Sequence, residues 1–328
     1  MAVTIQAHRL VRSGWAGALA RRMEHGDILF RWLLVAVAGG VLLLVAAVGY
    51  ELWINSALPR AQFGVGFLST TTWDPVVREF GALPFILGTL ITSLLALVLA
   101  IPVSLGIAIF LSELAPPWLS TLLGFLVELL AAVPSVVYGL WGLFVFVPIV
   151  VRPVAEALNQ TLGFTALFAG PVFGPSRLAA SLILAIMILP TISAVSRDVF
   201  RAVPNSQREA ALALGATEWE MISQVLVPYG LSGILGAVIL GLGRALGETM
   251  AVTMVIGNNL DLTPSLLHPG YTMASIIANE FTEATYDLYL QSLIEIGLVL
   301  FVGTLLLNLI ARFLVWQVAR RVPQEVRA

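Results

Sequence analysis

The sequence predicts an all-α integral membrane protein with six transmembrane helices and both termini on the cytoplasmic side. Three observations lead to this fold class: the scarcity of charge, six long apolar stretches, and the uneven distribution of arginine. Of the 328 residues, 59% are hydrophobic and only 11% are charged, whereas soluble domains carry about 25% charged residues. So few charges could not cover the surface of a globule of this size, and they fit a protein whose outer surface is lipid.

A membrane helix needs roughly 20 mostly apolar residues to cross about 30 Å of hydrocarbon. Six stretches meet this length, at residues 30–53, 83–111, 119–150, 178–199, 231–256 and 292–316. The second and third stretches exceed one span and contain Pro102 and Pro134, so we expect tilt, a kink or a short re-entrant turn there. The first stretch is too long for a cleavable signal and predicts a retained anchor.

The arginines set the expected orientation, because basic residues gather on the cytoplasmic side. With both termini inside, the outer side holds only Arg60, Arg78, Arg152 and Arg177. The cytoplasmic side then holds Arg9, Arg12, Arg21, Arg22, Arg31, Arg197, Arg201, Arg208, Arg312, Arg320, Arg321 and Arg327. The connection 257–290 is acidic and lacks basic residues, as expected of an outer loop.

The domain boundaries follow from these stretches. We expect a cytoplasmic N-terminal segment at 1–29, a transmembrane domain at 30–317 and a cytoplasmic tail at 318–328. Hydrophobic side chains interleave with arginines in the first of these, which suggests an interfacial helix within residues 1–27.

The cytoplasmic loop 202–228 predicts two short helices. Ser206 and Glu209 have the S-x-x-E spacing of a capping box, in which each side chain satisfies a backbone donor of the first turn. Gly215 then closes the first helix, because glycine adopts the left-handed conformation without a Cβ penalty.

The same capping spacing recurs at Thr217 and Glu220, where the second helix is expected to begin. Pro228 is expected to end that helix, because proline has no amide proton to continue the ladder. The result would be a compact helix–turn–helix on the cytoplasmic face, although an incidental amphipathic loop is the alternative.

Four ionisable side chains fall inside the apolar stretches: Glu128, Arg244, Glu248 and Glu295. A charge deep in a span costs at least about 2.5–3.5 kcal/mol, so such residues are functional candidates. Arg244 lies roughly 20 Å into its stretch by helical rise. Glu248 follows at i+4, so a continuous helix would place both side chains on one face, where they can pair. Glu295 lies near the outer end of the last stretch, where interfacial solvation is expected.

Two interpretations of Arg244 and Glu248 remain open. In the first, the two charges neutralise each other and fix helix packing. In the second, the guanidinium lines a pathway and stabilises a passing oxyanion, because its fork of donors matches two oxygens at once. The carboxylate would then orient the anion or accept a proton from a protonated one, which sulfate at neutral pH does not offer. The pairing could also keep the site inactive until substrate arrives.

The third stretch contains a proline break followed by small and aromatic residues. Pro134 frees a backbone carbonyl, and Ser135 or Tyr138 could occupy the gap. A packing kink and a gate are both open interpretations of this break. Glu128 could be the partner of the break, or it could face Arg244 across the bundle.

The cytoplasmic loop resembles the EAA loop of ABC importer permeases. The residues that carry the resemblance are Glu209, Ala210, Ala211, Gly215, Val225, Val227 and Pro228. Isoleucine and leucine are usual in that family where this chain has its two valines. The resemblance implies the type I ABC importer permease fold. It also implies that the loop seats in a groove of a cytoplasmic ATPase and transmits its closure, with Glu209, Ala210, Ala211, Gly215 and Pro228 as the coupling residues.

The runs 243–251 and 133–142 look like those of phosphate-specific importer permeases of the PstC type. In that family the arginine and glutamate of the fifth span are implicated in phosphate passage, which maps onto Arg244 and Glu248. We take four further side chains in or beside these runs as pathway candidates: Glu128, Ser135, Tyr138 and Thr249.

This resemblance also implies the partners of the chain. They would be a second permease of the PstA type, an ATPase dimer that binds ATP and Mg²⁺, and an extracytoplasmic phosphate-binding protein. The chain itself would hold no cofactor, metal or nucleic acid, and would lie in the cytoplasmic (inner) membrane among lipids.

Other functions are less consistent with the sequence. An enzyme is disfavoured because His8, His25 and His268 have no metal-ligand spacing, and a chain without lysine cannot form a phosphate-binding P-loop. A secondary transporter or channel would explain the buried charges but not the loop 202–228. Permeases for sulfate, molybdate or phosphonate remain possible, although they usually lack the run around Arg244.

Overall fold

The computed structural model describes residue 28 and residues 30–321 of the chain. The interfacial helix expected within residues 1–27 lies outside the described residues, as does the end of the expected C-terminal tail. The chain divides into two compact units, Met1–Ile54 and Asn55–Ala328. The first unit contains the helix Phe30–Ile54, whose apolar side chains are almost all exposed within that unit.

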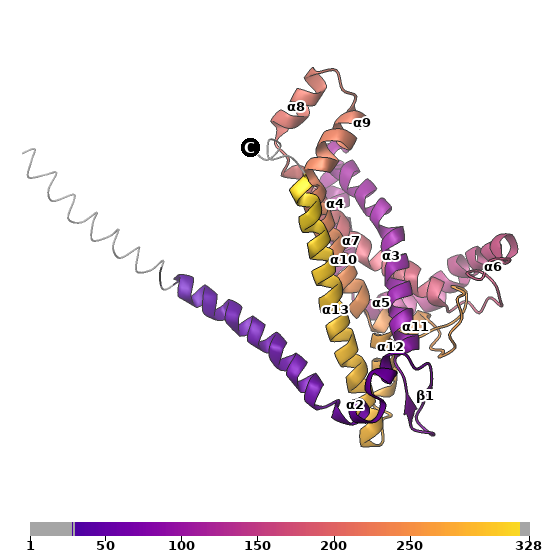
Figure 1. Ribbon diagram of the computed structural model, residues 1–328. Helices are drawn as coiled ribbons and strands as arrows, with labels where there is room; N and C mark the ends of the chain where they lie inside the picture. The colour runs from indigo at the N-terminus through magenta and orange to yellow at the C-terminus, as the bar shows by residue number, and fades with distance from the viewer. Residues whose placement is uncertain (1–27, 29, 322–328) are drawn as a thin grey trace, which may run out of the picture. The chain divides into compact units, whose positions relative to one another are not determined.

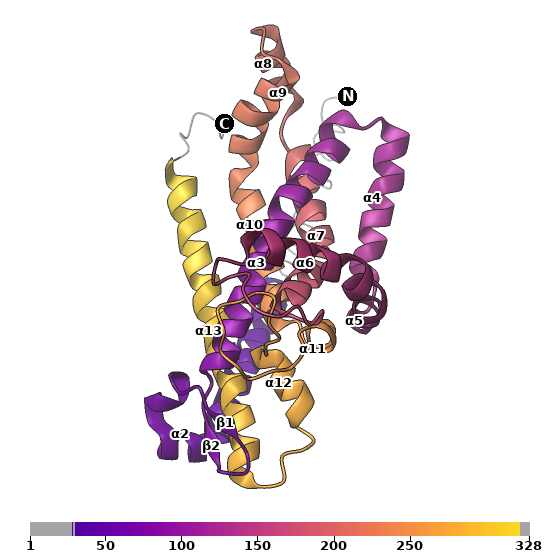
Figure 2. The ribbon, with the colours of Figure 1, turned by 90° about the vertical axis from the view of Figure 1, so that its right-hand side faces the viewer.

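The second unit begins with short elements and continues as a helical bundle (Figures 1 and 2). Its first elements are α2 (Ala57–Phe63), the 3₁₀ helix η1 (Gly64–Leu68), and the antiparallel strands β1 (Trp73–Asp74) and β2 (Glu79–Phe80). The bundle elements are α3 (Leu83–Ile109), the π-helix η2 (Phe110–Leu114), α4 (Pro117–Ala132), α5 (Ser135–Trp141), the π-helix η3 (Gly142–Val151), α6 (Arg152–Leu162), α7 (Arg177–Arg201), α8 (Asn205–Ala213), α9 (Glu218–Met221), the π-helix η4 (Ile222–Leu226), α10 (Val227–Gly247), α11 (Met250–Val255), α12 (Met273–Glu280) and α13 (Asp287–Arg321).

Helix α7 is the central element of the bundle. It packs against α3, α10 and α4, and two thirds of its most apolar window is buried, more than in the other long apolar helices of the described chain. Small residues let its neighbours approach closely. A Cβ at Gly233 of α10 would lie only 2.4 Å from Cγ2 of Val199, and one at Gly241 would lie 2.8 Å from Cδ1 of Ile192. Glycine therefore sets the α7–α10 distance at both points.

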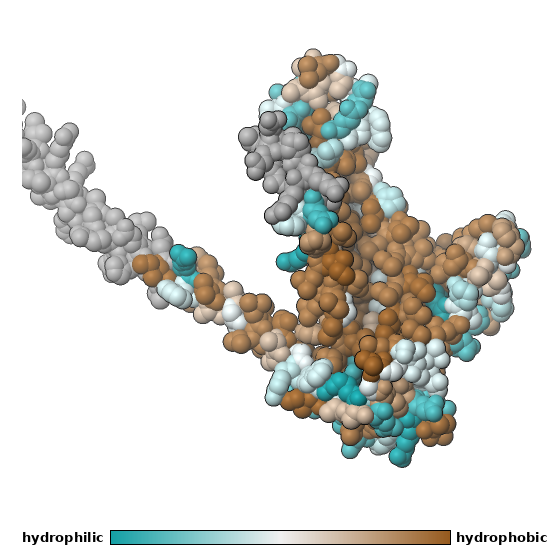
Figure 3. Space-filling model, in the orientation of Figure 1, coloured by the Kyte–Doolittle hydropathy of each residue, from teal (hydrophilic) through white to brown (hydrophobic). Residues whose placement is uncertain are grey.

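Among the described residues, six helices are long and apolar enough to cross a membrane. Those in the second unit form an apolar band, and hydrophilic side chains gather among apolar ones beyond both of its ends (Figure 3). Four of them match the expected stretches closely: Phe30–Ile54, Leu83–Leu114, Arg177–Arg201 and Asp287–Gln317. The expected number of spans is confirmed.

The third expected span, 119–150, is wrong as one helix. The chain breaks into α4 and a second helix, Ser135–Leu162, and the latter has the length of a span. Val133 is extended at the break, with φ −66° and ψ 129°. A residue before proline is pushed out of the helical region by the proline ring, so Pro134 produces a complete break rather than a kink.

The fifth expected span, 231–256, has the wrong boundaries. The helix begins at Glu218 and ends at Gly247, and α11 is a separate short helix. Glu248 is extended at the break, with ψ 125°. Its Oε1 accepts a hydrogen bond of 3.3 Å from the amide of Ala251, so the side chain caps α11 from the position before the N-cap residue, Thr249.

The end of the bundle that carries α2, β1 and α12 is built on aromatic packing. Trp73, Phe80 and Tyr289 belong to one buried cluster. Glu295, in α13, is only 7% exposed and pairs with Arg60 at 3.3 Å. The prediction that Glu295 is solvated at the interface is therefore wrong, because an ion pair to Arg60 of α2 compensates its burial instead.

Candidate functional site

The loop between α7 and α10 contains α8 and α9, which project beyond the end of the bundle in both ribbon views (Figures 1 and 2). The predicted capping box at Ser206 and Glu209 is wrong. Helix α8 begins at Asn205, its N-cap is Pro204, and no side chain caps it. Because the helix begins two residues earlier than predicted, Ser206 lies within its first turn rather than at the cap.

The predicted glycine turn and second capping box are confirmed. Gly215 has φ +87°, and a Cβ there would meet nothing within 4 Å, so backbone conformation alone requires glycine. The amide of Thr217 donates to Oε2 of Glu220 at 2.8 Å. In return, the amide of Glu220 donates to Oγ1 of Thr217 at 3.3 Å.

The predicted end of the second helix at Pro228 is wrong. The helix runs without interruption from Glu218 through η4 and α10 to Gly247. In η4 the amide of Val227 bonds the carbonyl of Ile222, five residues earlier. This π-helical step changes the hydrogen-bond register just before Pro228, so the helix passes a residue that cannot donate. Helix α9 and the fifth span are consequently one rod.

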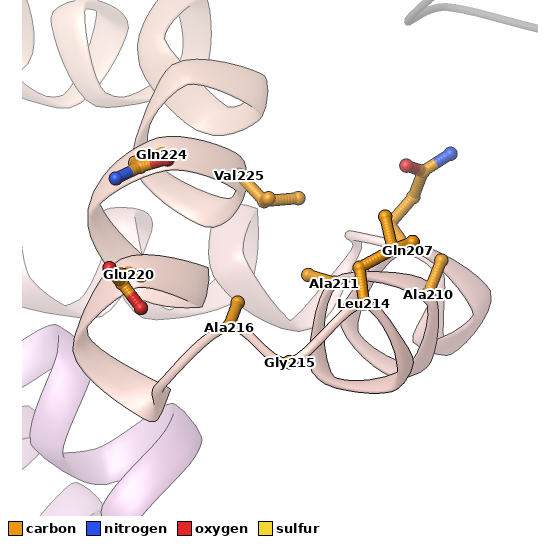
Figure 4. A pocket seen from close by; sticks show the side chains of 9 residues that line it. All are labelled: Gln207, Ala210, Ala211, Leu214, Gly215, Ala216, Glu220, Gln224 and Val225. Carbon is orange, nitrogen blue, oxygen red and sulfur yellow. The ribbon is translucent and has the colours of Figure 1, made fainter.

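A cleft of about 520 Å³ separates α8 from the start of this rod. Its lining consists of Gln207, Ala210, Ala211, Leu214, Gly215, Ala216, Glu220, Gln224 and Val225. Figure 4 shows Gly215 at the bend, with the α8 residues on one side and Gln224 and Val225 on the other. Leu214 is 90% exposed and the nearby Trp219 is 71% exposed. This apolar exposure is what a docking surface requires.

The expected pair of Arg244 and Glu248 does not form within the described residues. Glu248 lies beyond the end of α10 and caps α11. Arg244 instead donates from Nη1 to Oγ1 of Thr191 in α7, at 3.3 Å. The i+4 argument failed because it assumed a continuous helix through Gly247. Thr191 was missed, since a threonine beside a mid-helix proline gives no sequence signal for a partner in another span.

The expected side-chain partner of the Pro134 break is confirmed as Tyr138. Its hydroxyl donates at 2.8 Å to the carbonyl of Leu130, the residue four positions before Pro134. Ser135 opens α5 and is half-buried. Tyr138 and Ala245, the residue after Arg244, belong to the same buried cluster.

Helix α11 approaches α5 closely beside these groups. A Cβ at Gly139 would lie 3.1 Å from Cα of Ala251, so only glycine permits the contact. Thr249, at the break, donates from Oγ1 to the carbonyl of Gly247 at 3.1 Å. Helices α5, α7, α10 and α11 all contribute to one buried cluster, which includes Ala245 beside Arg244.

Glu128 does not pair with either of its expected partners, the Pro134 break and Arg244. It projects from α4 with 59% of its side chain exposed, and its Oε1 accepts from Nη2 of Arg197 at 2.8 Å. The expectation that it pairs with the Pro134 break or with Arg244 was therefore wrong. Gly124 makes room for this contact, because a Cβ there would meet the Arg197 guanidinium. Over the described chain, no group of histidines and carboxylates could hold a metal ion.

Comparison with known proteins gives one consistent family. Residues 100–323 match the family described as the binding-protein-dependent transport system inner membrane component. The chain is similar to "Phosphate transport system permease protein PstC" of Xylella fastidiosa, with 46% identity over 305 residues that cover 92% of this chain and 94% of the relative. It is 45% identical to the PstC protein of Mesorhizobium japonicum over 325 residues, which cover 98% of this chain and 99% of the relative. It is 48% identical to the PstC protein of Haemophilus influenzae over 293 residues, which cover 88% of this chain and 93% of the relative.

Two solved structures share the fold. A chain of a bacterial alginate ABC transporter, in complex with an alginate-bound periplasmic protein, aligns with a TM-score of 0.58 and 19% identity, over 87% of this chain and 94% of that one. A chain of the inward-facing MetNI methionine ABC transporter aligns with a TM-score of 0.54 and 16% identity, over 75% and 99%. The fold is therefore that of ABC importer permeases. The chain belongs to the family of inner membrane components of binding-protein-dependent transport systems, and it is a multi-pass protein of the inner membrane.

Proposed function

We propose that this chain is the permease subunit that carries inorganic phosphate through an ATP-driven importer. One observation carries the proposal: Arg244 is held half-buried in a span by a neutral hydroxyl, that of Thr191, and no carboxylate of the described residues pairs with it. Its positive charge is therefore available to an anion. The names of the relatives, all phosphate permeases with 45–48% identity, support phosphate as that anion.

The chemistry of the site suits a partly protonated oxyanion. A guanidinium offers parallel donors to two oxygens at once, and Tyr138 belongs to the buried cluster that includes Ala245, the neighbour of Arg244. Glu248 follows α10 directly and uses Oε1 for Ala251. Its carboxylate can accept a hydrogen bond from a protonated phosphate oxygen, which sulfate at neutral pH does not provide.

The α8–α9 loop is the proposed contact with a cytoplasmic ATPase dimer. Glu209, Ala210 and Ala211 lie on α8, and Ala210 and Ala211 line the cleft beside it. Gly215 fixes the bend, and Pro228 lies inside the rod Glu218–Gly247. A force on the loop thus reaches Arg244 through one helix. ATP and Mg²⁺ are bound by the ATPase, and a PstA-type permease and an extracytoplasmic phosphate-binding protein complete the machine.

This assignment includes a cytoplasmic location for the loop and for both chain termini, with segment boundaries at 1–29, 30–317 and 318–328. The distribution of arginine supports it. A permease for sulfate, molybdate or phosphonate is the alternative, and a secondary anion transporter is a weaker one because it would not need the exposed loop.

Uptake of radiolabelled phosphate by the assembled importer tests the proposal. Arg244→Gln should lower the initial rate by about 10- to 100-fold, the effect of losing hydrogen bonds to a charged group, without loss of complex assembly. Arg152→Gln is the control, because Arg152 forms an exposed ion pair with Glu156 in α6. Undiminished phosphate uptake by Arg244→Gln, or preferred transport of sulfate by the unaltered complex, would contradict the proposal.

A further inference from the structure

Arg208, in α8, forms a two-pronged ion pair with Glu113, in η2 at the end of the second span. Its Nε donates to Oε2 and its Nη2 to Oε1, both at 2.9 Å. The side chains are 15% and 8% exposed. This pair joins the expected coupling loop to the second span, whereas along the chain the loop continues into the fifth span.

The same guanidinium also binds the end of α7. Its Nη2 donates to the carbonyl of Phe200 at 2.7 Å, and its Nη1 donates to the carbonyl of Val203. The carbonyl of Phe200 also accepts from the amide of Val203 at 3.2 Å, so Arg208 adds a second donor at the end of α7 while it holds Glu113. One side chain thereby fixes α8 against both α7 and η2.

The energetics favour a fixed geometry over a sliding contact. Two charges this well buried are stabilised only while they remain paired and hydrogen-bonded. A bidentate contact also specifies orientation as well as distance. The pair Arg152–Glu156 contrasts with it, because those side chains are 63% and 49% exposed and such pairs contribute little.

Further contacts extend this connection into α4. Nη2 of Arg201 donates to Oγ of Ser120 at 3.0 Å, and Ser120 donates to the carbonyl of Leu111 at 2.6 Å. Arg197 pairs with Glu128, about two turns beyond Ser120 along α4. Helix α4 leads directly to the break at Pro134 and to Tyr138, which binds back to Leu130 of α4.

We infer that Glu113 and Arg208 are positioning residues for energy coupling, and that they carry displacement of α8 to η2 and α4. The inference rests on the proposed function, because it assumes that α8 contacts an ATPase. The loop then acts on Arg244 by two routes. One is the rod Glu218–Gly247, and the other runs through the ion pair and α4 to Tyr138.

The experiment measures ATP hydrolysis and phosphate uptake in the same proteoliposomes and reports phosphate transported per ATP. Glu113→Gln and Arg208→Lys should each retain the ATPase in the purified complex but lower this ratio by about fivefold or more, a usual size for coupling between sites. Glu113→Asp keeps the charge and should restore part of the ratio. The double variant should lower the ratio no further than either single variant, because both changes break one contact.

Glu156→Gln, at the exposed pair, is the matched control and should leave the ratio unchanged. An unaltered ratio in Glu113→Gln would overturn the inference, and so would additive losses in the double variant. Loss of the complex in every variant, Glu113→Asp included, would also overturn it, because the pair would then serve only the fold. Failure of the unaltered complex to couple phosphate uptake to ATP would instead refute the proposed function.

Discussion

The hydroxyl of Tyr138 donates a 2.8 Å hydrogen bond to the carbonyl of Leu130, the acceptor that Pro134 leaves without its helical donor. The amide of Val133 reaches the same oxygen only at 3.4 Å. The phenol therefore holds α4 and α5 at a defined angle across the break.

Replacement of Tyr138 by phenylalanine should loosen this break. We expect a loss of about 1 kcal/mol of stability, the usual net value of one hydrogen bond, together with slower phosphate uptake. Thermal unfolding of the purified complex and uptake in cells measure the two effects. Tyr50→Phe is the control, since Tyr50 is exposed on the first helix. Equal stability and uptake in both variants would show that Tyr138 only fills space.

Thr191 should control how Arg244 is presented. Thr191→Val removes the oxygen that accepts from Nη1 while keeping the size of the side chain. We expect a change of about 10- to 100-fold in the KM for phosphate with little change in complex assembly, because a hydrogen bond to a charged group contributes about 1.5–3 kcal/mol. Thr191→Ser keeps the hydroxyl and should behave as the unaltered protein. Identical KM values for the valine and serine variants would contradict this role.

Glu248 has two separable tasks, the cap on α11 and the proposed contact with a protonated anion. Glu248→Gln keeps an oxygen for the amide of Ala251 but removes the charge. It should preserve stability and lower uptake, and the loss should be measured against pH over the titration of phosphate. Glu248→Ala should lose the cap as well, at a cost of about 1 kcal/mol. Full uptake by the glutamine variant would leave Glu248 with a capping role alone.

Gly215 should tolerate asparagine better than alanine. Its φ of +87° is strained for a residue with a Cβ although the space is open, so Gly215→Ala should cost about 1–2 kcal/mol locally. We expect the alanine variant to lose coupled ATPase activity and Gly215→Asn to retain more of it. Gly106→Ala is the control, because that glycine has ordinary φ and open space. Coupled activity that is equal in all three variants would refute the requirement for a left-handed bend.

The apolar length of the stretches predicted the spans well, because hydrocarbon thickness is a strong constraint that acts on composition alone. Breaks inside those stretches were harder to predict. Pro134 signalled one, although its severity depended on Val133 becoming extended. The break at Glu248 depended on a side chain capping the next helix, and the passage of the helix through Pro228 depended on a π-helical step.

Local chemistry predicted the loop only in part. Thr217 and Glu220 formed their capping box because α9 begins where the pattern indicates. Ser206 did not, because Pro204 starts α8 earlier. The ion pairs of Glu113, Glu128 and Glu295 join residues far apart in the chain. Composition and spacing contain no information about such partners.

The rod Glu218–Gly247 has a mechanical consequence. Its 30 residues span roughly 45 Å by helical rise, and Gly233 presses it against Val199 about midway. A rigid helix that is held at one contact point tilts about that point, so its two ends move in opposite directions. A push toward α7 at the Trp219 end would therefore swing Arg244 away from α7, and a pull would return it. Opening on one side of the membrane and closing on the other would then be a single motion.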